Sequence, residues 1–400
     1  MNRPPSTQET RSAKADAIPR TVVALGVVSL LMDTSSEMVH SLLPVFLVSV
    51  MGASPLVVGI IEGVAEATAA VTKVFSGTVS DWVGRRKPLI LLGYGLAALT
   101  KPVFALAPTV GWVATARFAD RFGKGIRGAP RDALVADVTP AHLLGAGIGL
   151  RQSLDTVGAF VGPIIAVLVM SLSGDYRLVF WIAAIPACLA VLVIVTAVKE
   201  PTVHGEARAK RLSWADVKRF PGAYWAVVAI AVVMTLARFS EGFLLLRAQS
   251  VGLGPALVPL VFVVMNVVYA GSSYPVGALS DRLGRRGLLL GGFAVLIVAD
   301  LVLAAGNDIA AVMAGVALWG LHMGMTQGLL ATMVADAAPP DLRGTGYGGF
   351  HLASGAALLL ASVIAGWLWT AIGPAATFMA GAVFSGIALL ALLLWRGRAA

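Results

Sequence analysis

Long runs of apolar residues follow one another along almost all of this 400-residue chain and leave room for few fold classes. Hydrophobic residues make up 58% of the sequence and charged residues 13%, which is about half the charged fraction of a typical globular domain. A water-soluble protein cannot cover its surface with so few charges. A helix needs about 20 apolar residues to cross a bilayer, and the runs are continuous rather than alternating as in a membrane β-barrel. The sequence therefore predicts a polytopic, all-α membrane protein.

The sequence predicts twelve transmembrane helices, which the 44 glycines would allow to pack closely. Their expected ranges are 21–50, 56–80, 88–107, 110–131, 142–172, 178–199, 222–247, 254–279, 287–306, 308–334, 344–371 and 374–396. We expect two six-helix bundles, at 21–199 and 222–396, joined by a polar cytoplasmic linker at 200–221. Cytoplasmic tails at 1–20 and 397–400 flank them, and the first tail is expected to be disordered.

Basic residues are concentrated in alternate loops, and this asymmetry predicts the orientation of the chain. The loops after the second, fourth and eighth spans are expected to hold Arg85, Arg86 and Lys87, then Lys124, Arg127 and Arg131, and then Arg282, Arg285 and Arg286. Lysine and arginine favour cytoplasmic loops, so both termini are predicted to be cytoplasmic. No apolar signal-peptide segment precedes the first span, and a bacterial-type inner (plasma) membrane is the expected location.

The two halves of the chain repeat each other. The segment Gly77-Thr-Val-Ser-Asp81-Trp-Val-Gly84-Arg85-Arg86 returns 200 residues later as Gly277-Ala-Leu-Ser-Asp281-Arg-Leu-Gly284-Arg285-Arg286. Likewise, Val135-Ala-Asp137-Val-Thr-Pro140 returns 199 residues later as Val334-Ala-Asp336-Ala-Ala-Pro339. Repeats of this kind are typical of secondary transporters, in which the substrate binds between the repeats near the membrane midplane.

The paired loops resemble the signature of the major facilitator superfamily, and the resemblance covers the whole chain. It implies a monomer that moves a small-molecule substrate across the lipid bilayer by alternating access, with two pseudo-twofold-related bundles. It also implies a conformational latch, in which an aspartate binds an arginine or a helix end in only one state. The latch residues would be Gly77, Asp81, Gly84, Arg85, Arg86, Gly277, Asp281, Gly284, Arg285 and Arg286. Alternatively, the arginines only fix the topology.

A glycine-proline motif in the fifth span resembles one that is associated with proton-driven exporters of this superfamily. It consists of Gly149, Gly158, Gly162 and Pro163. Two further glycines of the family pattern are replaced by Ala166 and Val167. We expect a smooth, bent helix that slides against the other half, with ordinary small-residue packing as the alternative. In the fourth span, Arg121-x-x-x-Gly125-x-x-x-Ala129 resembles the basic motif that the family has on that helix.

Ionisable residues inside the expected spans are the most informative signal, because each costs at least about 2.5–3.5 kcal/mol at the bilayer centre unless it is paired or faces water. On the first span, Asp33, Glu37 and His40 share one helix face. The predicted proton-coupling and substrate-cavity residues are Asp33, Glu37, His40, Arg117, Asp120, Arg121, Arg151, Asp155, Arg238, Glu241, His322 and His351. Glu62 and Glu66 are one turn apart but are expected towards the outer end of their span.

This pattern predicts a proton-coupled secondary transporter, an antiporter that exports a small molecule. A carboxylate such as Asp33 or Asp155 would alternate between a protonated state and an ion pair with Arg121, and a static ion pair is the alternative for each residue. The proton is the coupling ion, and no cofactor is expected. The sequence contains no Walker-type phosphate loop and no hydrolase motif, so ATP-driven pumping and enzymatic activity are not expected. The scattered basic residues do not indicate nucleic acid binding.

Two other functions are compatible with the sequence. His322 and Met325 share a helix face and, together with His40, could form a soft or borderline metal site. A divalent transition-metal transporter, of the nickel, cobalt or copper type, is therefore one alternative. Methionines that fill a helix interface explain the same residues without a metal, and no metal site is predicted. A non-transporting membrane receptor that has this fold is the other alternative.

Overall fold

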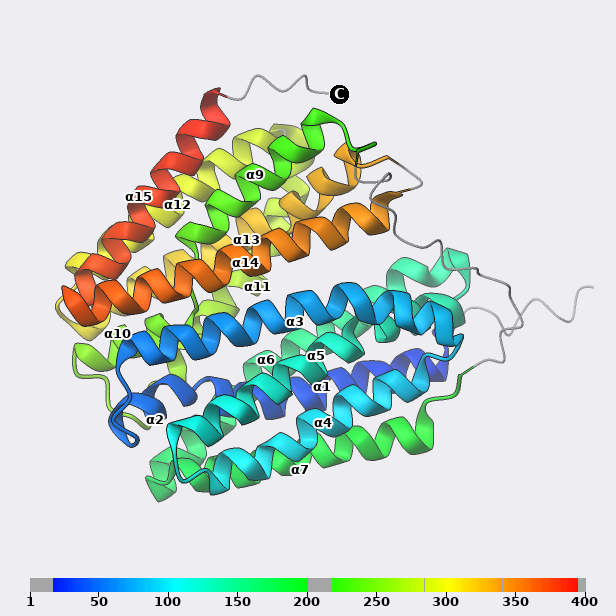
Figure 1. The fold of residues 1–400 in the computed structure, drawn as a ribbon, viewed down its shortest axis with the longest axis horizontal. Coiled ribbons are helices and arrows are strands. Elements are labelled where there is room, and N and C mark those ends of the chain that lie inside the picture. The colour runs from blue at the N-terminus through cyan, green and yellow to red at the C-terminus, as the bar shows by residue number, and fades with distance from the viewer. Residues whose placement is uncertain (1–16, 201–217, 284, 340–341, 395–400) are drawn as a thin grey trace, which may run out of the picture.

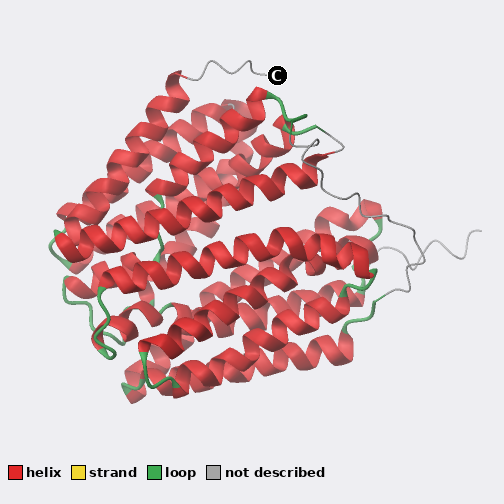
Figure 2. Cartoon of the chain, in the orientation of Figure 1, coloured by secondary structure: helices red, strands yellow, loops and turns green. Residues whose placement is uncertain are grey.

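The computed structural model describes residues 17–200, 218–283, 285–339 and 342–394, and these form helices, turns and loops without a strand (Figure 1, Figure 2). This confirms the predicted all-α fold. The predicted tails and linker lie largely outside the described residues.

The first half of the chain is a bundle of helices that run side by side in alternating directions (Figure 1). They are α1 (Arg20–His40), α2 (Leu43–Ser49), α3 (Pro55–Val83), α4 (Lys87–Leu106), α5 (Val110–Val138), the short 3-10 helix η2 (Ala141–Leu143), α6 (Leu144–Ser173) and α7 (Tyr176–Ala197). We call the side of the molecule where α1 begins, at Arg20, the terminal side. Because directions alternate, α3 begins on the opposite side, at Pro55, and ends on the terminal side.

The second half has the same order of helices. They are α9 (Gly222–Ala237), α10 (Gly242–Ser250), α11 (Leu260–Leu283), α12 (Arg285–Ala305), α13 (Ile309–Ala337), α14 (Arg343–Ala371) and α15 (Pro374–Leu394). With α1–α2 and α9–α10 each taken as one span, ten spans among the described residues are long and apolar enough to cross a membrane. The other two predicted spans contain α5, which carries many charges, and α11, in which the apolar run is shorter.

Helix α5 is longer than the sequence suggested, and the reason is that Arg127 and Arg131 find partners inside the bundle. The prediction that Lys124, Arg127 and Arg131 lie in a loop was wrong, because all three are in α5. The guanidinium of Arg127 lies 4.5 Å from the centre of the Tyr94 ring. Arg131 donates to Ser29 Oγ at 3.1 Å. Partners inside the bundle therefore allow the helix to continue to Val138.

The helix packing repeats between the halves, as the sequence repeat predicts. In the first half, α1 packs against α6 and α7, α4 against α5 and α7, and α3 against α5. In the second half, α9 packs against α14 and α15, α12 against α13 and α15, and α11 against α13. The halves meet where α3 packs against α14 and α6 against α11, and the same pseudo-symmetry exchanges these two contacts.

Glycines allow α3 and α14 to approach closely between the halves (Figure 1). A Cβ atom added at Gly63 would lie 3.0 Å from Leu359 Cα, and one added at Gly355 would lie 2.7 Å from Ala70 Cβ. A Cβ at Gly366 would meet the carbonyl oxygen of Pro55 at 2.7 Å. The contact between α3 and α14 is therefore closest at glycine positions, where no side chain separates the two helices.

The two halves are sealed together on the opposite side of the molecule. Leu42 and Phe46 of the first half share one apolar core with Phe243 and Leu244 of the second, and all four are fully buried. The side-chain amide of Gln249 also donates to Ser49 Oγ at 2.7 Å. The structure is therefore closed on the side that is remote from Arg20.

Candidate functional site

A polar cavity of about 330 Å³ lies between the two halves. It is lined by Glu37, His40, Glu62, Glu66, Arg121, Lys124, Thr235, Arg238, Phe239, Ser240, Glu241 and Leu358. A second cavity, of about 240 Å³, shares Glu66, Lys124 and Thr235 with it and reaches Lys73 and His351. Because Lys73 is nearer than Glu66 to the end of α3, the second cavity leads towards the terminal side.

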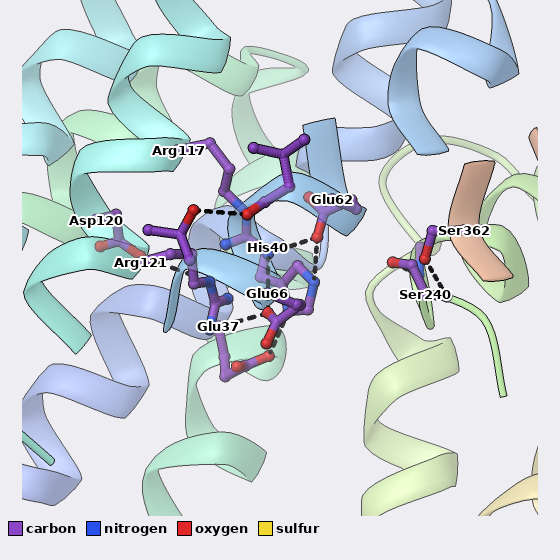
Figure 3. Close-up of polar contacts among 12 residues, drawn as sticks. Glu37, His40, Glu62, Glu66, Arg117, Asp120, Arg121, Ser240 and Ser362 are labelled. Carbon is purple, nitrogen blue, oxygen red and sulfur yellow. Dashed lines mark hydrogen bonds and ion pairs between the residues drawn. The ribbon is translucent and has the colours of Figure 1, made fainter. Parts of the chain in front are cut away.

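His40 bridges two carboxylates on the wall of the cavity (Figure 3). Its Nδ1 lies 3.5 Å from Glu37 Oε2, on the same helix, and its Nε2 lies 3.5 Å from Glu62 Oε2, on α3. Glu62 also accepts a 2.6 Å hydrogen bond from Arg117 Nη2. Glu62 and Arg117 are each 1% exposed, so this pair is removed from water. The ring of Phe262 packs against the imidazole of His40, with centroids 5.1 Å apart.

Glu62 and Glu66 line the cavity, although they are not among the residues predicted for it. Glu62 and Arg117 both lie seven residues after the first residue of their helices, Pro55 and Val110, and both helices start on the opposite side. At 1.5 Å per residue they therefore reach the same depth, about 10 Å into the bundle. This equal depth is the signal that could have predicted the pair. This depth agrees with the expected position of the two glutamates towards the outer end of their span, and both also line the cavity.

The basic motif of α5 places Arg121 beside Glu66. A Cβ atom at Gly125 would lie 2.9 Å from the carbonyl oxygen of Ala69, and one at Gly77 would lie 3.4 Å from Ala129 Cβ. These small residues bring α5 against α3. Arg121 Nη1 consequently lies 3.3 Å from Glu66 Oε1.

Asp120 faces away from the cavity, towards α4. Its Oδ1 accepts a 2.8 Å hydrogen bond from Lys101 Nζ, and Lys101 is only 1% exposed. Asp120 does not line either of the two cavities, in contrast to the prediction. Lys101 was missed because a lysine near the end of a predicted span is usually exposed at the membrane surface.

Asp33 and Asp155 form a second acidic group, between α1 and α6. Their carboxyl groups are close enough for a hydrogen bond once one of them carries a proton. Arg131 Nη1 and Arg151 Nη1 lie 3.7 and 3.5 Å from the two carboxylate oxygens of Asp155. The expected pairing of Asp33 or Asp155 with Arg121 is not observed, because Arg121 lies beside Glu66 instead.

The glycine-proline motif packs within its own half rather than against the other half. A Cβ atom at Gly158 would lie 3.1 Å from Asp33 Cβ, and one at Gly162 would lie 2.9 Å from Glu37 Cβ. These two glycines therefore pack α6 against the face of α1 that carries Asp33 and Glu37. The prediction that they form a sliding surface against the second half was wrong. Gly149 has no neighbour within 4 Å at its Cβ position, and Pro163 is buried inside α6.

The second half lines the cavity with a break between two helices. Helix α9 ends at Ala237 and α10 begins at Gly242, so residues 238–241 are not helical. Arg238 Nη2 and Glu241 Oε1 are 3.9 Å apart across this break. Non-helical backbone at membrane depth is tolerated where it lines a cavity.

Contacts from neighbouring helices hold the break in place. The backbone N–H of Ser240 donates to Ser362 Oγ at 3.2 Å (Figure 3). Phe239 is buried and packs its ring against Phe243, Trp319 and Phe378. Arg238 and Glu241 are thus presented to the cavity by a supported segment.

The predicted histidines of the second half are not brought together with His40. His322 is fully buried, with Nδ1 2.8 Å from the carbonyl oxygen of Gly292, and it lines neither cavity. His351 lines the second cavity. His322 and Met325 both lie against Gly292 of α12, whereas His40 lies between Glu37 and Glu62, so the possible metal set of these three residues does not converge. Within the described part of the chain, no group of three or more His, Cys, Asp or Glu side chains is arranged to hold a metal ion.

The first latch loop ties the end of α3 to α5. Arg86 Nε lies 3.0 Å from Asp137 Oδ2, and Arg86 Nη1 donates to Ser80 Oγ at 2.9 Å. Gly84 ends α3 with a φ of +68°, a conformation that favours glycine. The side chains of Asp81, Asp281, Arg285 and Arg286, together with Gly277 and Gly284 of the second loop, lie outside what the structure describes.

Two repeat-related helical bundles around a central polar cavity define a membrane transporter. The sequence model of the Major Facilitator Superfamily matches residues 25–247 and 225–400, and the chain belongs to this superfamily. The chain is 32% identical over 385 residues to the MFS-type transporter MJ1317 of Methanocaldococcus jannaschii, which covers 94% of this chain and 95% of that protein. It is therefore a transporter and not an enzyme.

Two further likenesses are more distant. The multidrug resistance protein Stp of Mycobacterium tuberculosis is 23% identical over 362 residues, covering 75% of this chain and 67% of Stp. A crystal structure of a mutant nucleoside transporter NupG superposes with a TM-score of 0.78 at 14% identity, covering 93% of this chain and 99% of that one. At this identity the structural likeness shows the fold alone.

Proposed function

We propose that this transporter is a proton-coupled antiporter that exports a small molecule. The observation that carries the proposal is the chain of Glu37, His40 and Glu62 on the wall of the central cavity, with 3.5 Å between neighbouring groups. Imidazole and carboxyl groups are the side chains best suited to exchange protons in the physiological range. Here they lie where a substrate would be held.

The arrangement supports competition between the substrate and the proton. Asp33 lies one helical turn before Glu37 on α1, so Asp155, Asp33, Glu37, His40 and Glu62 form a series from the terminal side into the cavity. A proton on Glu62 would cancel the negative charge that Arg117 neutralises. A positively charged group of a substrate held in the same cavity would disfavour that proton, and the proton would disfavour the substrate. Mutual displacement of two ligands in one cavity is the basis of antiport.

The packing of α6 on α1 would transmit the change to the helices. Gly158 and Gly162 bring the backbone of α6 against Asp33 and Glu37. A change in the charge or hydration of these carboxyl groups therefore acts directly on the contact between two helices. The name of Stp, a multidrug resistance protein, agrees with the direction of export that the glycine-proline motif implies.

We also propose that the terminal side faces the cytoplasm of a bacterial-type inner membrane, and that the protein works as a monomer. Arg86, between α3 and α4, and Lys87, the first residue of α4, lie on the terminal side, as the positive-inside rule requires. In this orientation the second cavity leads from the cytoplasm to the central cavity. An exporter would take up its substrate by this route.

Everted membrane vesicles test the proposal directly. Respiration acidifies the interior of the vesicles, and a pH-sensitive dye reports this acidification. A compound that the transporter exchanges for internal protons raises the internal pH and restores the dye signal. We expect a subset of a broad metabolite and drug panel to restore the dye signal in wild-type vesicles. His40→Gln and Glu62→Gln should lose this response. Asp300→Asn is the matched control, because Asp300 is a fully buried carboxylate that lines neither cavity, and it should keep the response.

Two results would contradict the proposal. One is transport of a labelled compound that leaves the dye signal unchanged, which indicates a uniporter. The other is an unchanged response in both variants, which would remove the His40 chain from the coupling mechanism.

A further inference from the structure

The carboxylates that the first half places on the cavity wall are already matched by partners. Glu37 lies beside His40, Glu62 accepts a hydrogen bond from Arg117, and Glu66 lies 3.3 Å from Arg121 Nη1. These charges are neutralised within the first half. A ligand that bound them would have to break an existing pair.

The remaining charges of the wall are less engaged. The 3.9 Å between Arg238 and Glu241 is too long for a hydrogen bond, and Arg238 Nε is buried without a hydrogen-bond partner. Lys124 lines both cavities and forms no ion pair with the residues described. Two cations and one anion are thus available to a ligand.

We infer that the substrate is a compact zwitterion, which carries a carboxylate or similar anion together with an ammonium group. The inference rests on the proposed function and names its substrate class. The anionic group binds Arg238 of the second half and Lys124 of the first. The ammonium group binds Glu241. This carboxylate also faces three groups of the first half, which are Glu37 and His40 of α1 and Glu66 of α3. The ligand thereby joins the two halves at the helix break.

Ligands with a single charge fit this wall less well. A cation alone would approach Glu241 but would draw it away from Arg238, in a cavity that Lys124 also lines. An anion alone would separate Arg238 from Glu241 and leave that carboxylate unpaired. An unpaired charge in a low-dielectric site is costly. The cavity volume of about 330 Å³ is near the lower end of the range for ligand pockets, which favours a compact molecule.

A cysteine placed in the cavity can report occupancy by a probe of known charge. Cys188 is the single cysteine of the sequence and is exposed, so Cys188→Ala gives a clean background. Thr235→Cys puts a thiol where both cavities meet. The rate of its reaction with N-ethylmaleimide, which is uncharged, is measured on the purified full-length protein. The probes are leucine, leucinamide and N-acetylleucine, which are similar in shape and differ in charge, with the same triplets for alanine and phenylalanine.

We expect a zwitterionic member of at least one triplet to slow the labelling several-fold and saturably, while its amide and N-acetyl relatives do not. Arg238→Gln and Glu241→Gln should each remove this protection. Asp300→Asn, remote from both cavities, should retain it. Equal or better protection by the cationic or anionic relatives overturns the inference, and so does the absence of protection by every zwitterion.

The labelling experiment is independent of proton coupling. It needs no pH gradient. If no zwitterion protects the cysteine, the proposed substrate class is wrong, while the response of everted vesicles still tests the antiport mechanism. Conversely, protection by a zwitterion that moves no protons in vesicles would support the substrate class and contradict the antiport mechanism.

Discussion

The two halves share one fold and one helix-packing pattern but treat charge in different ways. In the first half, buried ion pairs connect neighbouring helices at short distances, with 2.6 Å between Arg117 and Glu62 and 2.8 Å between Lys101 and Asp120. In the second half, the only charged side chains that line the central cavity, among the residues described, are Arg238 and Glu241, which lie 3.9 Å apart on a helix break. An aromatic cluster around Phe239 supports that break in place of ion pairs.

This difference indicates a division of labour between the repeats. A buried pair that loses one partner leaves an uncompensated charge, so the first half is a framework in which proton occupancy has large consequences. A loose pair beside a cavity can exchange partners at little cost. The second half is therefore better suited to meet the substrate. Four sets of substitutions test this difference between the two halves.

The largest expected effect is that of Arg117→Met. Glu62 would remain buried with its charge uncompensated, and breaking a buried ion pair costs about 3–5 kcal/mol. Thermal unfolding of the purified protein in detergent should show a large loss of stability. The double variant Arg117→Met with Glu62→Gln should recover much of it, because the unpaired charge is gone. If Arg238→Met in the second half is as destabilising as Arg117→Met, the contrast between the halves is wrong.

The next largest effect should come from Gly162→Ala. The added Cβ atom would lie 2.6 Å from the carbonyl oxygen of Thr34 and 2.9 Å from Glu37 Cβ. Overpacking of this kind costs about 1–3 kcal/mol, and it would also move α6 away from α1. We expect a lower melting temperature and slower transport. Gly149→Ala is the matched control, since its Cβ position is empty, and it should be neutral. Equal behaviour of the two variants would remove α6 packing from the mechanism.

The fold could be predicted almost completely from the sequence, because hydropathy and the repeat constrain membrane helices strongly. Each predicted span contains helix, and the packing pairs repeat between the halves. The predicted end of α5 failed because Arg127 and Arg131 find partners inside the bundle, and a hydropathy pattern cannot distinguish such residues from a basic loop. The helix breaks at 41–42 and 238–241 were not predicted either, since no proline or glycine lies at either position.

The site could be predicted only in part from the sequence. Both the depth of a residue in the bundle and the direction of its side chain must be known. Glu37, His40, Arg121, Arg238 and Glu241 do line the central cavity. Asp120 and His322 are at similar depths but face neighbouring helices of their own half. A rotation of a helix by one residue position decides whether a side chain faces the cavity or a neighbouring helix. The charge pattern of the sequence alone does not determine this rotation.

A smaller effect on stability, with a clear functional signature, is expected for His40→Gln. Glutamine can retain polar contacts to Glu37 and Glu62 but cannot take up a proton. The rate of transport should therefore depend less on pH between about pH 5 and 8, where an unperturbed histidine changes its charge. The measurement is the initial rate of labelled-substrate flux into vesicles at a series of pH values, because this variant is expected to give no dye response. A variant profile that parallels the wild-type profile would assign the coupling to other groups.

The smallest effect on stability is expected when the charges of the second half are exchanged. Arg238→Glu with Glu241→Arg keeps both charges on the break, and at 3.9 Å the two side chains have no hydrogen bond to lose. The melting temperature should hardly change. The equivalent exchange in the first half, Arg121→Glu with Glu66→Arg, should be much more disruptive, because Arg121 is only 3% exposed and also lies 3.9 Å from Asp120. The exchange in the second half should nevertheless abolish transport, since the cation would no longer share the substrate's anionic group with Lys124. A stable variant that still transports would show that the order of charges along the break does not matter, and the second half would then have to recognise its substrate by other groups.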